Sequence, residues 1–249
     1  MKHILSALLL AFITVSFTAN AQAADSDIKK AIEGSFPGTK ITSISKSPIN
    51  DIFEVVTQSP RGPLVIYADS MGQHLLIGDL LNVASKRNLT SERMEKLTAI
   101  KWESLPLKNA IKVVKGDGSR KLAVFSDPDC PYCRKAEVEF AKLDNVTIYT
   151  FAYPLAMHPD AGRKSKLVWC SKDRAQAWLD LMLKNVVPSG KADCDNPIEE
   201  NLALGAKLRI DGTPALIFEN GKRIPGYVDA TRLETMLDGT EVRKVGSRN

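Results

Sequence analysis

A pair of cysteines separated by two residues, the C-P-Y-C motif at 130–133, constrains this chain more than any other feature. The apolar run 122–125 before it has the composition of a buried strand, and residues 134–143 have the apolar spacing of a helix. A cysteine at the start of a helix faces unpaired backbone N–H groups, and the helix dipole there favours a thiolate over a thiol. The sequence therefore predicts that Cys130 is a nucleophile at a helix N-terminus.

The second cysteine of the motif, Cys133, lies one turn further into the predicted helix, where it should be more deeply buried and within reach of Cys130. Pro131 suits the first turn because its missing N–H is not needed there. A purely structural disulfide is an alternative, but closing a ring of about four residues stabilises a fold by only ~1.9 kcal/mol. We therefore expect a redox-active pair in which Cys133 is the resolving thiol.

A zinc site is the other alternative for the cysteines, and it would need further Cys or His ligands at short spacing. The remaining cysteines, Cys170 and Cys194, are 24 positions apart and have no His beside them. His158 has no partner at ligand spacing either, so we interpret it as a surface or loop residue and not as a metal ligand or a base. The sequence predicts thiol chemistry without a metal ion or a bound cofactor.

Four cysteines allow three disulfide connectivities. We favour 130/133 with 170/194, because the first pair is adjacent, although the sequence leaves the other two pairings open. A ring of about 25 residues between Cys170 and Cys194 would stabilise the fold by ~3.5 kcal/mol, which favours a structural disulfide there.

The first 23 residues have the pattern of a signal peptide: Lys2 near the start, an apolar run at 4–17, and the small-x-small sequence Ala21-Gln22-Ala23. The apolar run is too short for a comfortable transmembrane helix. Export to the periplasm would also suit a protein that carries disulfides, since they persist in oxidising compartments.

Charge argues against nucleic acid as a partner. Removal of the predicted signal peptide takes away one charged residue, Lys2, so the formal net charge falls from +5 to +4. The remaining basic residues are interspersed with acidic ones, which is typical of a solvated mixed surface.

The region 24–88 is predicted to form a small antiparallel sheet behind a short helix at 27–36. Strand-like segments separated by turns that contain Pro or Gly occur at 41–45, 52–57, 64–68 and 74–81. So small a region is marginal alone, which suggests a dimerisation domain. The alternative is that the sheet packs on the rest of its own chain.

A linker helix is expected at 89–106, running from Ser91 to about Leu105 with Thr90 as its N-cap, and ending before Pro106. The second domain, 107–249, would then begin with a β-hairpin that pairs 110–114 with 121–125.

Residues 146–153 are expected to form a buried strand after the motif helix, which gives a parallel strand–helix–strand unit. Helices at 161–170 and 174–184 form an inserted helical subdomain, and a final helix spans 230–237. This is the order of a thioredoxin-like fold. The fold class predicted for the chain is therefore α+β, with a small antiparallel sheet, a linker helix and a thioredoxin-like α/β domain.

Several motifs together resemble the bacterial periplasmic protein disulfide isomerases of the DsbC/DsbG family over nearly the whole predicted mature chain. They are F-S-D-P-D-C-P-Y-C at 125–133, V-W-C-S-K-D at 168–173, C-D at 194–195, A-L-G at 203–205, G-T-P-A at 212–215, N-G at 220–221 and P-G-Y at 225–227.

The resemblance implies a V-shaped homodimer, formed by the N-terminal domains, that rearranges or reduces wrong disulfides in misoxidised exported proteins. It implies that Cys130 is kept reduced by a membrane reductase of the DsbD type. It also implies a cis peptide bond before Pro214, with Thr213 facing the cysteines so that its backbone can pair with an extended substrate.

The chain departs from the pattern of the DsbC branch at two places, and other functions stay open beside isomerisation. The dipeptide Pro131-Tyr132 is typical of DsbG, so a DsbG-like reductase of oxidised cysteines is a second interpretation, and a holdase chaperone with accessory redox activity is a third. An oxidase of the DsbA type would lack the N-terminal domain.

Six residues before Cys130, where thioredoxins keep a buried carboxylate, this chain has Val124. The sequence identifies no proton acceptor for Cys133.

Overall fold

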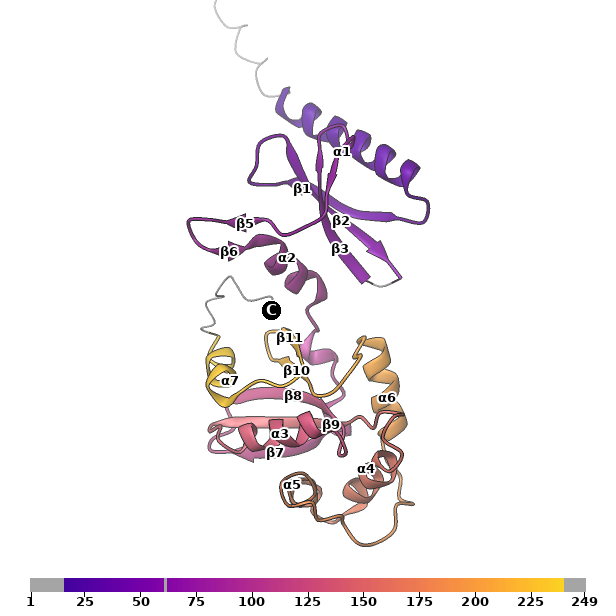
Figure 1. Cartoon of the computed structure of the whole chain (residues 1–249), viewed down its shortest axis with the longest axis vertical. Coiled ribbons are helices and arrows are strands. Elements are labelled where there is room, and N and C mark those ends of the chain that lie inside the picture. Colours follow the sequence, from indigo (N-terminus) through magenta and orange to yellow (C-terminus); the bar gives the residue numbers. More distant parts are fainter. Residues whose placement is uncertain (1–15, 61, 240–249) are drawn as a thin grey trace, which may run out of the picture. The chain divides into compact units, whose positions relative to one another are not determined.

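The computed structural model describes residues 16–60 and 62–239. The described residues divide into two compact units, the first ending at Leu97 and the second beginning at Thr98, and each unit is described by itself (Figure 1). Most of the predicted signal peptide, residues 1–15, lies outside the described residues. The predicted processing site at 21–23 lies within the first helix, α1 (Ser16–Ser35).

The first unit is an antiparallel sheet covered by α1. The sheet has the order β1–β2–β3–β4, with β1 at Lys40–Lys46, β2 at Ile52–Ser59, β3 at Gly62–Asp69 and β4 at Leu75–Leu76. Ile28 and Ile32 lie one helical turn apart on α1 and are buried against Val55 of β2 and Ile66 of β3. The predicted antiparallel sheet is confirmed.

The predicted fourth strand, 74–81, is wrong in its extent. Only Leu75 and Leu76 pair with β3, after which the chain leaves the sheet and forms a two-stranded ribbon from β5 (Leu81–Asn82) and β6 (Arg87–Asn88). Leu80 instead forms hydrogen bonds with the start of the next helix: its N–H donates to the Thr90 hydroxyl at 2.8 Å, and its carbonyl accepts from the Leu89 N–H.

The predicted linker helix is also shorter than expected. Helix α2 spans Leu89–Thr98, and Asn88 caps it by accepting from the Ser91 N–H, whereas Thr90 bonds to the Tyr67 hydroxyl. Two short 3₁₀ turns follow, at Trp102–Ser104 and Leu107–Asn109.

The helix ends where it does because the residues after it belong to the core of the second unit. The Ile100 N–H donates to the Gly221 carbonyl at 2.9 Å, and Ile100, Trp102 and Leu105 pack in one buried cluster with the central sheet. Tertiary burial therefore overrides the local helical preference.

The second unit is a five-stranded mixed sheet with the order β11–β10–β8–β9–β7. Its strands are β7 (Ile111–Lys115), β8 (Arg120–Ser126), β9 (Val146–Ala152), β10 (Ala215–Phe218) and β11 (Arg223–Pro225). Strands β8 and β9 are parallel and are joined by α3 (Pro131–Phe140), as the sequence predicted. The predicted parallel strand–helix–strand unit of this domain is confirmed.

The predicted hairpin of the first two strands is wrong, because β9 lies between β7 and β8. The turn at 116–119 is built around the start of β9: the Asp117 N–H donates to the Asn145 side chain, and the Thr147 hydroxyl donates to the Gly118 carbonyl. Gly116 adopts a positive φ of 57°, and a Cβ there would lie 2.3 Å from Asn145 Oδ1. The Gly118 N–H donates to the Lys115 carbonyl at 3.1 Å, so the turn is tight, but the strand it leads to lies on the far side of β9.

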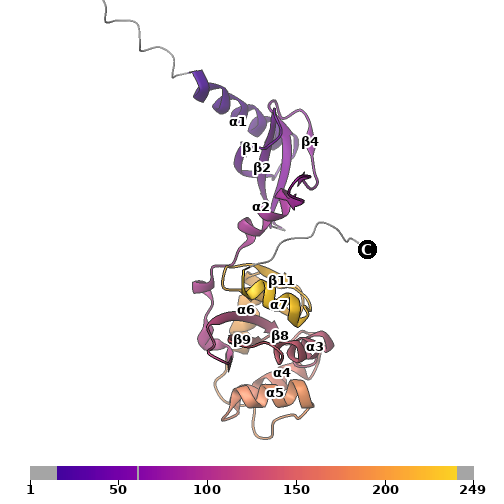
Figure 2. The ribbon, with the colours of Figure 1, turned by 90° about the vertical axis from the view of Figure 1, so that its left-hand side faces the viewer.

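Alternate residues of β8 fill the two faces of the sheet. Leu122 and Val124 pack against α3 and α7 (Ala230–Leu237), which lie on one side of the sheet (Figure 2). Ala123 and Phe125 pack on the other side, where Phe125 stacks on Phe151 with ring centroids 5.0 Å apart. A strand that is buried on both faces has a continuous apolar sequence, as residues 122–125 do.

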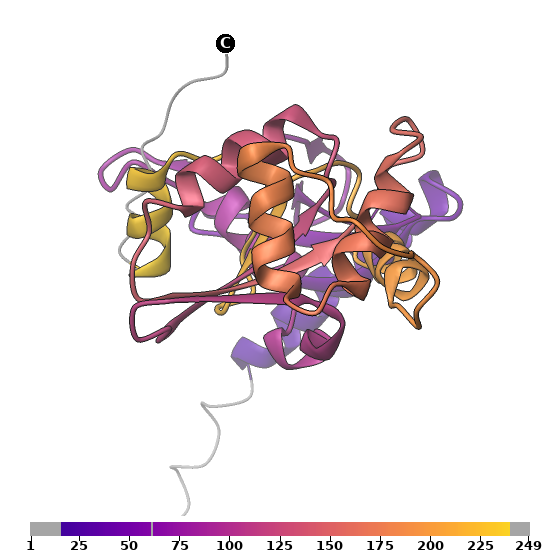
Figure 3. The same cartoon turned by 90° about the horizontal axis from the view of Figure 1, so that it is seen from below.

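Three helices are inserted between β9 and β10: α4 (Ala161–Cys170), α5 (Arg174–Lys184) and α6 (Ile198–Lys207). Helix α5 packs against α3 and against β7 (Figure 3), with Trp178 and Leu181 fully buried there. Cys170, at the end of α4, is bonded to Cys194 in the loop before α6. This disulfide closes the loop that contains α5.

We expect the Cys170–Cys194 disulfide to contribute stability and not chemistry. Replacing both cysteines by Ala should lower the free energy of unfolding by about 3.5 kcal/mol, the loop-closure value for a ring of about 25 residues. Denaturant unfolding measures this change. Labelling of Cys130 in the folded double variant is the control. If thiol exchange were lost while the double variant stayed folded, the structural role would be wrong.

Candidate active site

The C-P-Y-C motif lies at the carboxyl end of β8, where the chain turns into α3. Cys130 is the N-cap of α3, and Pro131 is its first residue, where a missing N–H costs no hydrogen bond. The Cys130 thiol donates to the Thr213 carbonyl, with 3.4 Å between sulfur and oxygen. The Thr213–Pro214 peptide bond is cis. Residues 83 positions apart in sequence thus meet at the start of one helix.

Both motif cysteines are free thiols, and they differ in their surroundings. Cys133 is fully buried, and burial raises the pKa of its thiol to about 12, although the Ser126 and Thr213 hydroxyls and the Asp127 N–H lower it in part. That N–H lies 3.4 Å from the Cys133 sulfur. Cys130 is 6% exposed, less than expected for a nucleophile at the surface. At neutral pH Cys133 is therefore protonated.

A buried carboxylate, Asp127, holds the loop before the motif, and the sequence analysis did not assign it a role. It accepts from the Asp129 N–H at 2.7 Å and from the Leu155 N–H at 2.6 Å, and the His158 ring nitrogen Nδ1 lies 2.9 Å from it. His158, which we expected to be a loop residue without a role, therefore joins this cluster. An acidic residue directly after a buried strand was the available signal.

A second carboxylate, Asp129, is tied to two cations beside the motif. Lys164 of α4 reaches it at 2.5 Å, and Arg134 of α3 lies 3.8 Å away while donating to the Leu181 carbonyl. Tyr132, by contrast, is 64% exposed and points its apolar ring toward solvent. The polar groups around the motif fix its backbone, and the exposed surface next to Cys130 is aromatic.

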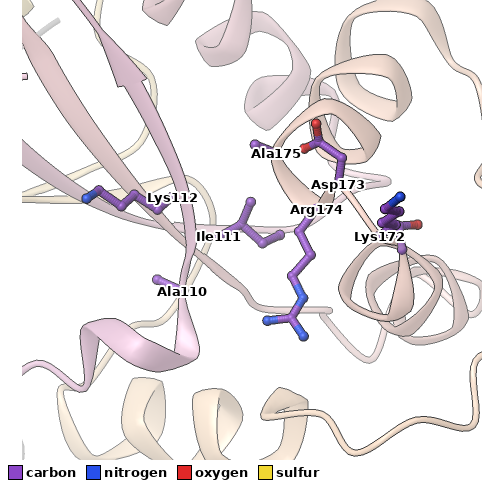
Figure 4. Close-up of a pocket in the computed structure, with 8 residues that line it drawn as sticks. Ala110, Ile111, Lys112, Lys172, Asp173, Arg174 and Ala175 are labelled. Carbon is purple, nitrogen blue, oxygen red and sulfur yellow. The ribbon is translucent and has the colours of Figure 1, made fainter.

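A groove of about 810 Å³ lies elsewhere on this unit, between β7 and the start of α5. Figure 4 shows Ile111 pointing toward Arg174, whereas Lys112 points to the opposite side of the strand. Lys172, Asp173 and Arg174 supply most of its charge. Neither motif cysteine lines this groove, so we do not assign it to the thiol site.

Among residues 16–60 and 62–239, no group of three or more His, Cys, Asp or Glu side chains is arranged to hold a metal ion. Within the same described ranges, no helix is long and apolar enough to cross a membrane.

A thioredoxin-like domain that presents a free dithiol at a helix N-terminus, beside a cis-proline, defines a thiol–disulfide oxidoreductase. Residues 107–240 match the model of the thioredoxin-like domain, and residues 19–91 match that of the disulfide bond isomerase protein N-terminal domain.

Among curated proteins, the chain is 38% identical over 221 residues to the probable thiol:disulfide interchange protein DsbC of Bordetella pertussis, covering 88% of this chain and 77% of that protein. It is 30% identical over 237 residues to DsbC of Escherichia coli, covering 92% of this chain and 94% of that protein. A crystal structure of a disulfide interchange protein from Neisseria gonorrhoeae is 47% identical, with a TM-score of 0.53, and the match covers 55% of this chain and 98% of that one. The chain belongs to the DsbC family of thiol:disulfide interchange proteins.

We expect the two thiols to differ sharply in reactivity. In the reduced protein, iodoacetamide at pH 6–8 should label Cys130 and leave Cys133 unlabelled, because the pKa of Cys133 is raised to about 12 and its sulfur is buried. Peptide mass mapping at a series of times measures both residues. Unfolding in denaturant is the control and should make the two label equally. Equal labelling in the folded protein would contradict this difference.

Proposed function

We propose that this chain is a periplasmic protein disulfide isomerase and reductase, with Cys130 as the attacking thiol and Cys133 as the resolving one. The observation that carries the proposal is a free Cys130 at the N-cap of α3, whose thiol donates to the backbone carbonyl of Thr213. Cys170 and Cys194, which are already bonded to each other, are left with a structural role.

The chemistry follows from thiol–disulfide exchange. The Cys130 thiolate attacks one sulfur of a wrong disulfide, a mixed disulfide forms, and one substrate thiolate leaves. If a substrate thiolate then attacks the mixed disulfide, the substrate is isomerised and Cys130 is regenerated. If Cys133 attacks first, the substrate is reduced and Cys130 and Cys133 become a disulfide, which a reductase of the DsbD type must reduce again.

Substrate recognition near Cys130 would rely on the main chain. The backbone around Thr213 and Pro214 borders the Cys130 sulfur, so an extended substrate segment can lie beside it without a required side chain. The exposed ring of Tyr132 offers an apolar contact next to the reacting sulfur. Such a site suits misoxidised exported proteins of many sequences.

The first unit is proposed to be a dimerisation domain. Its sheet ends at the two-residue strand β4, and this strand and the segment after it carry exposed apolar side chains: Leu76 of β4 is 59% exposed, and Ile77 and Val83 beyond it are 72% and 89% exposed. A second copy of this surface would cover these side chains by an isologous contact. The family to which the chain belongs, with the signal-peptide pattern at 1–23, supports a periplasmic homodimer.

The isomerase assignment is tested by refolding a scrambled multi-disulfide protein with catalytic amounts of the full chain. Cys130→Ala should abolish activity, whereas Cys133→Ala should keep part of it, because substrate thiols can still resolve the mixed disulfide. Activity of the Cys130→Ala variant equal to that of the wild type would overturn the assignment. Suppression of aggregation alone would instead favour a holdase, and reduction of oxidised cysteines without isomerisation would favour a DsbG-like reductase.

Dimerisation can be tested without cutting the chain. The double variant Ile77→Asp with Val83→Asp should become monomeric, because it places charge on the proposed contact, and should lose most isomerisation while Cys130 labelling is unchanged. Light scattering after size exclusion measures the mass. Val186→Asp, which alters an exposed valine of the second unit, is the matched control and should stay dimeric. A double variant that remains dimeric would refute this surface.

A further inference from the structure

The reducing branch of the proposed mechanism leaves one proton without a destination. Cys133 must lose its proton before it attacks the mixed disulfide, yet burial raises the pKa of this thiol to about 12. The strand position six residues before Cys130 cannot help, because Val124 is an apolar side chain packed in the core. A buried group elsewhere must accept the proton.

Glu137 lies one helical turn beyond Cys133 on the same face of α3. Residues four apart on a helix have Cβ atoms roughly 5–6 Å apart, and long helical side chains generally lean toward the N-terminus, which is the direction in which Cys133 lies from Glu137. Glu137 is 4% exposed. Its Oε1 atom accepts a hydrogen bond of 2.7 Å from the Trp178 Nε1–H of α5. Trp178 and Cys133 belong to one buried cluster.

The carboxyl has an acid strength suited to this task. Burial raises the pKa of Glu137 to about 7, although the Trp178 hydrogen bond lowers it in part. A proton acceptor works best when its pKa lies near the working pH. Glu137 is therefore partly ionised at neutral pH and can both take up and release a proton.

Charged side chains near Glu137 have partners of their own. On α5, Asp180 pairs with Lys184, and Arg174 donates to the Trp169 carbonyl. Several other charged groups on or around α3 are also engaged: Arg134 with the Leu181 carbonyl, Lys135 over the Tyr227 ring, Glu139 with Lys142, Lys115 with the Phe140 carbonyl, and Asp127 with His158. Among the described residues, no cation forms an ion pair with Glu137.

We propose that Glu137 accepts the proton of Cys133 when Cys133 resolves the mixed disulfide. This deepens the function proposed above and rests on its reducing branch. The Cys133 S–H proton passes to the Glu137 carboxylate, and the Cys133 sulfur forms a bond to the Cys130 sulfur. The bond between Cys130 and the substrate breaks, and the substrate leaves as a thiolate. Over the two attacks, by Cys130 and then by Cys133, the protein dithiol loses two electrons and the substrate disulfide gains two.

The step can be isolated with an aromatic disulfide, dithiobis(nitrobenzoate), which releases a coloured thiolate twice. Attack by Cys130 releases the first equivalent, and attack by Cys133 on the mixed disulfide releases the second. Stopped-flow absorbance measures both phases in the full reduced chain. Because no protein substrate is involved, the result does not depend on whether the chain isomerises proteins.

In the wild type, the second phase should slow as pH falls through about 7, because the Glu137 carboxylate is then protonated. Glu137→Gln keeps an oxygen for the Trp178 hydrogen bond but cannot accept a proton. It should slow the second phase at least tenfold at pH 7–8 and abolish the inflection. The first phase should change by less than about twofold. Glu139→Gln, on the same helix, is the matched control and should leave both phases unchanged.

A second variant separates proton transfer from a structural effect. Trp178→Phe removes the hydrogen bond that lowers the pKa of Glu137, so the inflection of the second phase should move to higher pH. If Glu137→Gln leaves the rate and pH profile of the second phase unchanged, the proposal is wrong. It is also overturned if Glu137→Gln does not fold and Trp178→Phe leaves the inflection in place.

Discussion

Burial of β8 on both faces is the constraint on which the second unit depends. Leu122 and Val124 contact the helices on one side, and Ala123 and Phe125 fill the other, so no change of register keeps both sets inside. The strand therefore ends at a fixed place, and the turn that contains Asp127 starts there. The position of Cys130 at the N-cap of α3 is set by the packing of four apolar side chains before it.

The same burial that positions Cys130 separates the chemistry of the two thiols. Both thiols belong to the buried cluster that α3 shares with α5, but Cys130 is slightly exposed and donates to the Thr213 carbonyl, whereas Cys133 is fully buried. A thiol in that core is protected from exchange with solvent molecules but is hard to ionise. The same low polarity disfavours the ionised form of the buried Glu137 carboxyl, so one environment makes both groups harder to ionise.

Local patterns in the sequence predicted what depends on neighbouring residues. The apolar run 122–125 predicted the strand, the C-P-Y-C motif predicted the turn, and the residues after the motif predicted α3. These predictions rest on the burial pattern, the helix dipole and the signals of a helix start, which all depend on residues a few positions apart. The hairpin was mispredicted, because Asp117 and Gly118 form hydrogen bonds with Asn145 and Thr147, which are distant in sequence. The linker helix was predicted too long, because the Ile100 N–H donates a hydrogen bond to the carbonyl of Gly221, which is distant in sequence. The sequence did not predict a buried Glu137, because its burial depends on contact with Trp178 of another helix.

The buried carboxylate of Asp127 joins two loops into one rigid piece. It binds backbone N–H groups from its own loop and from Leu155, together with the His158 ring, so the segment 155–158 cannot shift without breaking bonds in the protein interior. Met157, in that segment, is 76% exposed. When a partner covers a side chain on a backbone that is already fixed, the rotamer entropy of that side chain is lost but no further backbone entropy. The loop anchored by Asp127 would therefore offer Met157 to a partner without the cost of ordering its backbone.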